Sequence, residues 1–182
     1  FGANLRGPGV TEANDSSVWW LNLPVEFVMA AREGSPAPGT SSTFADFEVQ
    51  SDDFWMGTAP GAQLVFTGRT AGGQRGLWVF TPYRGTRLLV IEGQSVEVAP
   101  GDARQVVSLA PFSEGYSING RRAVVTEDRQ VVFLAEVTGG QSAVFVAELP
   151  PMSLGCPSDW DNSGVINSQD FFAFLTDFFE ET

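Results

Sequence analysis

The sequence predicts an all-β body of tandem antiparallel hairpin repeats, followed by a short calcium-binding loop and one helix. Residues 17–149 consist largely of short apolar and aromatic runs separated by Gly, Pro, Asp and Ser. One twelve-residue segment of this region recurs further along the chain, and the character of the sequence changes after residue 158. We therefore expect a β-repeat body at 1–149, a linker at 150–158 and a calcium loop with its helix at 159–182.

The expected strands are runs of about four to eight apolar, β-branched and aromatic residues, each bounded by turn residues. Helical spacing with helix caps does not occur before residue 165. In chain order the expected strands are 17–22, 26–31, 63–70, 76–83, 86–93, 122–127, 130–137 and 142–149.

The recurring segment is QLVFTGRTAGGQ at 63–74, which aligns without gaps with QVVFLAEVTGGQ at 130–141. Half of the aligned positions are identical, including both glycines and the final glutamine. A degenerate earlier copy begins at Phe1, where FGANLR matches the stretch from Phe66 and SVWWL at 17–21 matches GLWVF at 76–80. The unit is therefore roughly 60–67 residues long, and about two and a third units are present.

A repeat of this length with about four short strands has the size of a propeller blade or of a two-hairpin layer. A propeller closes with about four or more blades, which is more than this body supplies. We therefore expect either a partial β-propeller-like arrangement, with further repeats upstream, or a small sandwich of two units. A duplicated hairpin used only for packing is equally compatible with the repeat.

Composition excludes several classes of function. The ten basic residues are all Arg, there is no His, and 22 acidic residues give a net charge of -12, so nucleic acid and anionic membranes are repelled. The absence of His removes Ser-His-Asp triads and His-ligated zinc. The single Cys156 forms no internal disulfide, and no apolar run is long enough for a membrane span.

Catalysis would have to depend on carboxylates alone. Two suitably spaced carboxylates are enough for glycoside hydrolysis, and Asp52-Asp53 lie beside Phe54-Trp55, where aromatic rings could stack on sugars. Neighbouring acids on a strand point to opposite faces, however, and Trp residues in such a body are more often core residues than a carbohydrate platform. The acids considered are Asp46, Glu48, Asp52, Asp53, Glu92, Glu97, Glu114, Glu127 and Asp128.

The segment 159–170 has the residue types and the spacing of a calcium loop. Calcium takes about six to eight oxygen ligands, which such a loop supplies from alternate positions. Gly164 stands where the chain turns sharply with a positive φ, and Val165 would bind through its backbone carbonyl oxygen. The expected metal ligands are Asp159, Asp161, Ser163, Val165, Asn167 and Asp170.

Two ligands of the loop indicate weak binding. Ser163 is neutral, and Asp170 replaces the bidentate Glu that usually closes such a loop, so we expect a dissociation constant on the order of 10⁻⁴–10⁻³ M. The same residues also suit an Asx-rich turn in which Asn167 caps the following helix, and the two interpretations are compatible.

A helix is expected from Asn167 to Phe179. Its apolar residues recur at helical spacing and form one stripe, which is too rich in Phe for a single loop and helix to bury. We expect this stripe to contact a partner, either a second loop-helix copy after Thr182, the β body or another protein. The expected partner-binding residues are Phe171, Phe174, Leu175, Phe178 and Phe179.

The tail GCPSDWDNSGVINSQDFFAFLTDFF resembles the GC-type dockerin tails of planctomycete-type secreted repeat proteins. The body, with AREGSPAPG and its repeated QxVF…GGQ hairpins, is similar to the tandem repeats that precede such tails. The resemblance implies calcium as the cofactor, an extracellular or cell-surface location, and docking to a cohesin-like protein or to a second dockerin copy. Dockerins carry two loop-helix copies, whereas this sequence has one.

These observations predict a non-catalytic secreted or surface-anchored protein whose tail binds Ca²⁺ and mediates docking. The alternative is a carbohydrate-binding or carboxylate-based glycoside-acting β-domain that carries the same tail, with a glycan as its ligand. Calcium-dependent association through the tail would favour the first, and tryptophan fluorescence changes with glycans would favour the second.

Overall fold

The computed structural model describes residues 1–22, 26–47, 56–59, 63–82, 84–110, 126, 128–149, 168–169 and 171–172. Within these ranges the body is all-β, and helical conformation is confined to Ser168, Gln169, Phe171 and Phe172. No helix in the described part of the chain has the length and hydropathy needed to cross a membrane. The strands are β1 (Gly2–Asn4), β2 (Ser16–Asn22), β3 (Glu26–Arg32), β4 (Phe44–Asp46), β5 (Met56–Ala59), β6 (Gln63–Thr70), β7 (Arg75–Thr81), β8 (Gly85–Ile91), β9 (Ser95–Ala99), β10 (Asp102–Ala110), β11 (Gln130–Val137) and β12 (Gln141–Glu148).

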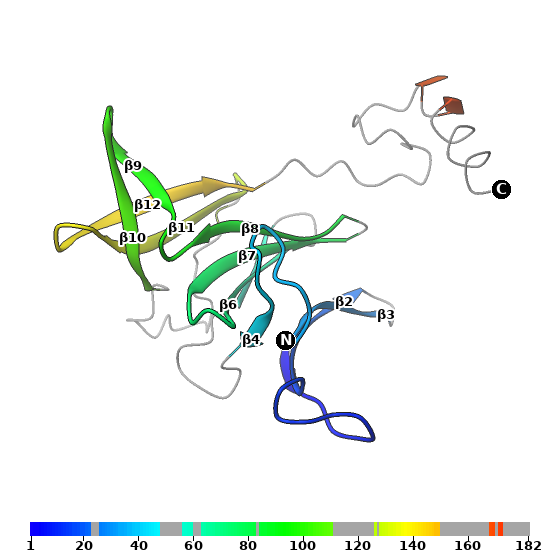
Figure 1. Ribbon diagram of the computed structural model, residues 1–182. Coiled ribbons are helices and arrows are strands. Elements are labelled where there is room, and N and C mark those ends of the chain that lie inside the picture. Colours follow the sequence, from blue (N-terminus) through cyan, green and yellow to red (C-terminus); the bar gives the residue numbers. More distant parts are fainter. Residues whose placement is uncertain are drawn as a thin grey trace, which may run out of the picture.

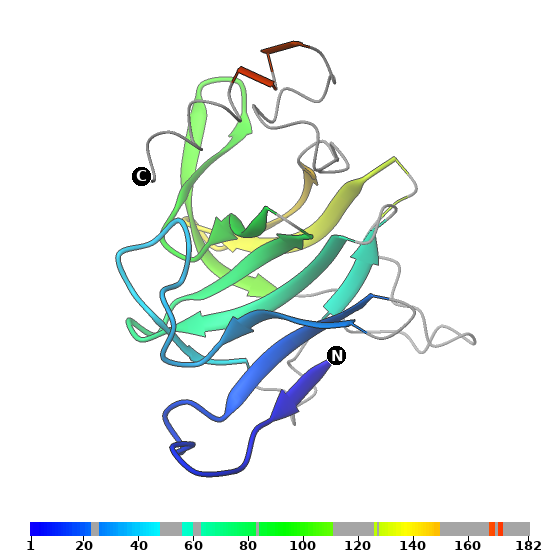
Figure 2. The ribbon, with the colours of Figure 1, turned by 90° about the vertical axis from the view of Figure 1, so that its right-hand side faces the viewer.

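The described strands form three antiparallel sheets. The first sheet has the order β1-β2-β3, the second β4-β6-β7-β8 with β5 also paired to β6, and the third β12-β11-β10-β9. The second sheet lies between the other two (Figures 1 and 2), because one buried apolar cluster occupies each of its faces. We refer to it below as the central sheet.

The hairpin β6–β7 is buried on both faces because its residues alternate between the two clusters. Leu77 and Val79 belong to the cluster that the third sheet covers, whereas Trp78 and Phe80 belong to the cluster that the first sheet covers. This two-sided burial explains why β7 is a continuous buried run rather than an alternation of apolar and polar residues.

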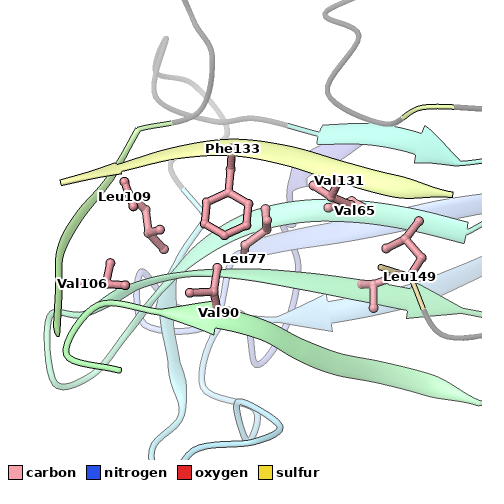
Figure 3. Close-up of a cluster of buried hydrophobic side chains, with 10 residues drawn as sticks. Val65, Leu77, Val90, Val106, Leu109, Val131, Phe133 and Leu149 are labelled. Atoms are coloured by element: carbon pink, nitrogen blue, oxygen red, sulfur yellow. The ribbon is translucent and has the colours of Figure 1, made fainter. Parts of the chain in front are cut away.

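The cluster between the central and third sheets is drawn in Figure 3. Phe133 and Val131 of β11 face Leu77 and Val65 of the central sheet. Strand β8 contributes Val90, with Leu89 packed against the cluster. Leu89 and Val90 are successive residues that reach the same cluster because the pairing of β7 with β8 shifts at a β-bulge between Leu77 and Trp78.

The cluster between the first and central sheets is aromatic. The Trp78 ring lies 4.9 Å from the ring of Phe44 and 6.4 Å from that of Phe66, and its Nε1 donates a hydrogen bond to the Pro38 carbonyl oxygen at 3.1 Å. Val18 and Ala31 are buried from the side of the first sheet, and Trp20 packs against the cluster.

The two matching sequence segments form hairpins whose turns are closed by the same hydrogen bond, although Gly139 has a φ of 99° and the aligned Gly72 has no positive φ. In the first, Gly73 N–H donates to Thr70 O at 2.8 Å, and in the second Gly140 N–H donates to Val137 O at 3.2 Å. Both glycines have positive φ, 81° and 70°, which is the conformation that favours Gly in a tight turn.

The degenerate copy follows the same strand register. In β1–β2, Gly2 pairs with Val18 and Asn4 pairs with Ser16. The aligned residues of β6–β7 pair in the same way, Thr67 with Leu77 and Arg69 with Arg75. The next strand also matches, because the β2–β3 register shifts between Val18 and Trp19, as the β7–β8 register does between Leu77 and Trp78. The first and central sheets therefore share one pairing scheme over three strands.

Strands β4 and β10 each hydrogen-bond to the turn that follows the third strand of one unit and pair with the first strand of the next matching hairpin. Phe44 pairs with Thr70 on β6, and Val106 pairs with Val137 on β11. Each pairing contains a register shift immediately afterwards, between Phe44 and Asp46 or between Val106 and Ser108. These crossing strands link the three sheets in sequence order.

The expected strands at 63–70 and 130–137 coincide with β6 and β11, and five others agree with the structure to within two residues at each end. The expected strand at 122–127 lies outside the described residues except for Thr126. Strands β1, β4, β5, β9 and β10 were not among the expected strands. Strand β4 is only three residues long, and β10 begins with alternating charged residues and then loses its alternation at the shift near Val106.

Candidate functional site: the C-terminal loop and the acidic turns of the body

The expected calcium ligands all lie outside the described residues. These are Asp159, Asp161, Ser163, Val165, Asn167 and Asp170. Of the expected partner-binding residues, Phe174, Leu175, Phe178 and Phe179 also lie outside them, and Phe171 is described.

The described residues at the end of the expected loop and just after it are helical, and two of them expose aromatic rings. Ser168, Gln169, Phe171 and Phe172 have helical conformation within the expected helix. Phe171 and Phe172 are 58% and 63% exposed, and their ring centroids lie 6.0 Å apart with the ring planes at 61°. An apolar surface is therefore open to solvent immediately after the expected metal loop.

In the body, two acidic side chains occupy corresponding turns. Glu92 follows β8, and its carboxylate accepts hydrogen bonds from Arg75 N–H at 2.8 Å and from Leu109 N–H at 3.2 Å. Glu33 follows β3, and its carboxylate accepts from Ser16 N–H at 3.2 Å. Glu92 was among the acids considered for hydrolysis, but here its oxygens join the central sheet to β10.

Partial burial raises the pKa of the Glu33 carboxyl above its ordinary value of 4.5. The hydrogen bond from Ser16 opposes this shift, while the charges of Asp15 and Asp46 add to it. Because the folded state holds this proton more tightly than the unfolded state, protonated Glu33 favours folding. That contribution is lost as pH rises from 4.5 through the raised pKa.

We therefore expect Glu33→Gln to remove a pH dependence of stability. The amide keeps an acceptor oxygen for Ser16 and carries no charge, so the free energy of unfolding of the wild type should fall relative to that of the variant as pH rises. The carboxyl is mostly solvated, so the change should stay below about 1 kcal/mol. Urea unfolding between roughly pH 4 and 7 measures it, and a wild-type-to-variant difference independent of pH would contradict the assignment.

The last residues of the two matching segments, Gln74 and Gln141, each form a side-chain hydrogen bond to a neighbouring part of the body. Gln74 Nε2 donates to Glu92 O at 2.7 Å, and Gln141 Oε1 accepts from Arg104 Nη1 at 2.7 Å. Arg104 also pairs with Asp102 at 2.8 Å, and its hydrogen bonds hold the pKa of Asp102 below the ordinary value of 3.8.

Residues 1–152 match DUF7453, which is described as a family of unknown function. The chain belongs to DUF7453. The match spans every described strand and ends before Asp159, so the expected calcium loop lies outside it. No curated protein and no solved structure matches the chain.

In this DUF7453 chain the described tryptophans are largely packing residues. Trp78 is fully buried, and Trp20 packs against the same aromatic cluster. Trp55 and the neighbouring Asp52-Asp53 lie outside the described residues. Trp19 is half-buried on the outer side of the first sheet, where its Nε1 donates to Ser17 Oγ at 2.9 Å.

Glu97 and Asp128, two further acids considered for hydrolysis, also lie among the described residues of the DUF7453 body. Glu97 Oε1 accepts from Gly101 N–H at 2.7 Å, which closes the β9–β10 turn. Asp128 is exposed beside β11. No group of three or more Asp, Glu or Cys side chains suited to a metal ion occurs among the residues that the structure describes.

Proposed function

We propose that this DUF7453 chain is a non-catalytic binding protein whose tail binds calcium and docks onto a partner protein. The observation that carries the proposal is the order of oxygen-bearing residues around Gly164 in 159–170. Helical conformation is found at the end of this segment and just after it, at Ser168, Gln169, Phe171 and Phe172. Such a loop brings together carboxylates that repel one another until a cation binds, so metal binding and ordering of the tail are coupled.

The exposed rings of Phe171 and Phe172 support the docking part of the proposal. Exposed apolar side chains on a short helical segment are a surface that a partner can bury. The resemblance to dockerin tails suggests a cohesin-like receptor or a second dockerin copy as that partner, at an extracellular or cell-surface location.

The body acts in this proposal as a propeller-like stack of blades. Support comes from the pairing scheme, in which each crossing strand joins the next hairpin and consecutive sheets pack face to face. Its acidic turn residues Glu33 and Glu92 bind backbone N–H groups of the strands, which is a structural task.

Calorimetric titration of the full chain with CaCl₂ tests the proposal. We expect saturable binding with a dissociation constant on the order of 10⁻⁴–10⁻³ M. The double substitution Asp159→Ala/Asp161→Ala should abolish it, because both carboxylates are expected ligands.

A matched control is Glu180→Ala/Glu181→Ala, which removes the same charge outside the loop and should leave the affinity within about twofold of wild type. Full calcium affinity in the Asp159→Ala/Asp161→Ala variant would disprove the ligand assignment. Absence of binding by the wild type at several times the expected dissociation constant would show that the loop only caps the helix.

A further inference from the structure

Both outer sheets expose apolar side chains on the side that faces away from the central sheet. We define the N-face by the exposed residues of β1–β3, and the C-face by the exposed residues of β10 and β12. Their exposures range from 43% to 60%. The N-face comprises Phe1, Leu21, Phe27 and Met29, and the C-face comprises Val107, Val144 and Val146.

The N-face is a continuous patch on one side of its sheet. Leu21 pairs with Phe27 across β2 and β3, and Trp19 pairs with Met29. The Phe1 ring packs edge-on against Phe27, with centroids 6.0 Å apart. The intervening residues, such as Val18, point to the opposite side and are buried against the central sheet.

The C-face is the corresponding side of the third sheet. Val144 pairs with Leu134, and Val146 pairs with Val132, so these four side chains share one side of β11–β12. Phe133 points to the other side and is buried against the central sheet.

The outer sheets share their strand register with the central sheet. In the central sheet the positions equivalent to the two faces are buried, so it shows what can cover them. When the two hairpins are aligned at Gln141 and Gln74, Val144 and Val146 take the positions of Leu77 and Val79 in the central sheet. Leu77 is 4% exposed and Val79 is 0% exposed. In the central sheet these two residues are covered by the following sheet. The C-face is therefore the surface on which a following sheet packs, and none of the described sheets covers it.

The N-face corresponds to the opposite side of the central sheet. Phe1 takes the register position of Phe66, and its neighbour Trp19 takes that of Trp78. Phe66 is fully buried beneath the preceding sheet, whereas Phe1 is 46% exposed. The N-face is thus the surface that packs on a preceding sheet.

We propose that these faces bind each other between two copies of this chain, with the N-face of one copy packed on the C-face of the next. The chain already contains this kind of interface twice, on the two sides of the central sheet (Figure 1). Face-to-face packing of a third such pair, about 10 Å apart, buries apolar side chains of both copies.

The interface is head-to-tail and heterologous, so one pairing leaves a free N-face at one end and a free C-face at the other. Further copies therefore add until a ring closes or a linear stack forms. This association uses the body and requires no calcium, which separates it from the docking proposed for the tail.

Sedimentation velocity of the full chain in EDTA, over a concentration series, tests the interface. Above the monomer mass of 19.6 kDa we expect a mass that rises with concentration. The variants Leu21→Glu/Phe27→Glu on the N-face and Val144→Glu/Val146→Glu on the C-face should each remain monomeric when alone. The matched control Ser41→Glu/Ala71→Glu adds the same charge at exposed turn positions that belong to neither face and should associate as the wild type does.

An equimolar mixture of the two face variants provides the decisive measurement. Each variant retains the face that the other has lost, so the mixture should form a heterodimer of twice the monomer mass that does not grow further. Circular dichroism of each variant checks its fold, and the heterodimer itself shows that both variants are folded. A wild type that stays monomeric at all concentrations, or folded variants whose mixture stays monomeric, would overturn the proposal.

Discussion

Replacing Trp78 with Ala should lower the free energy of unfolding by about 3–5 kcal/mol, the largest effect that we expect from a single truncation in this chain. Trp78 is fully buried and contacts the rings of Phe44 and Phe66. Truncation leaves a cavity between two sheets that are held by paired strands, so the site collapses only in part. It also leaves the Pro38 carbonyl without the indole donor. Urea unfolding with a shared slope measures the difference.

Trp19 provides a matched control because it occupies the same register position in the first sheet. Its ring is half-buried on the same side of the sheet as the N-face, and none of the described sheets covers it. We expect Trp19→Ala to cost less than about half as much when measured at a concentration where the chain is monomeric. Equal costs for the two substitutions would contradict the view that burial between sheets stabilises the fold through Trp78.

The substitution Gly39→Ala should destabilise the chain by about 2–5 kcal/mol through two separate effects. Gly39 has φ of 81°, a conformation that costs an L-residue about 1–2 kcal/mol. A Cβ atom at this position would also stand 2.7 Å from the Leu88 Cβ, which is closer than van der Waals contact allows. Since Leu88 packs against the aromatic cluster, relief of this clash must shift the cluster or the turn.

Gly101 separates the two effects. It ends the Ala-Pro-Gly sequence of the next unit with the same φ of 81°, but a Cβ there would meet nothing within 4 Å. Gly101→Ala should therefore cost only the backbone term, about 1–2 kcal/mol. Thermal and urea unfolding of both variants should rank Gly39→Ala as the more damaging. Equal losses would show that the contact with Leu88 relaxes at no cost.

Local patterns in the sequence account for most of the described strands. Strands β6 and β11 were predicted to the residue because β-branched and aromatic side chains fill them, and because a Gly-Gly turn ends each one at the same offset. The sequence also revealed the duplicated hairpin, and in both copies the same glycine N–H closes the turn.

Other features depend on contacts that no local pattern encodes. The carboxylates of Glu33 and Glu92 accept hydrogen bonds from strand N–H groups 17 residues earlier in the chain. The sequence signal that could have indicated this role is their shared position after the third strand of a unit and directly before a Gly. Strands β4 and β10 were missed because each is defined by its pairing with a later hairpin.

The sequence by itself determined the all-β class of the body, the positions of its hairpins and the residue types of the proposed calcium loop, because these depend on side-chain alternation, turn residues and ligand spacing over short distances. Only the tertiary structure decided which faces are covered. Trp78 and Val79 are both apolar neighbours on one strand, and their sequence does not say that different sheets bury them. The same holds for Val144 and Val146, which match buried residues in register yet are exposed, because burial depends on whether another sheet packs above them.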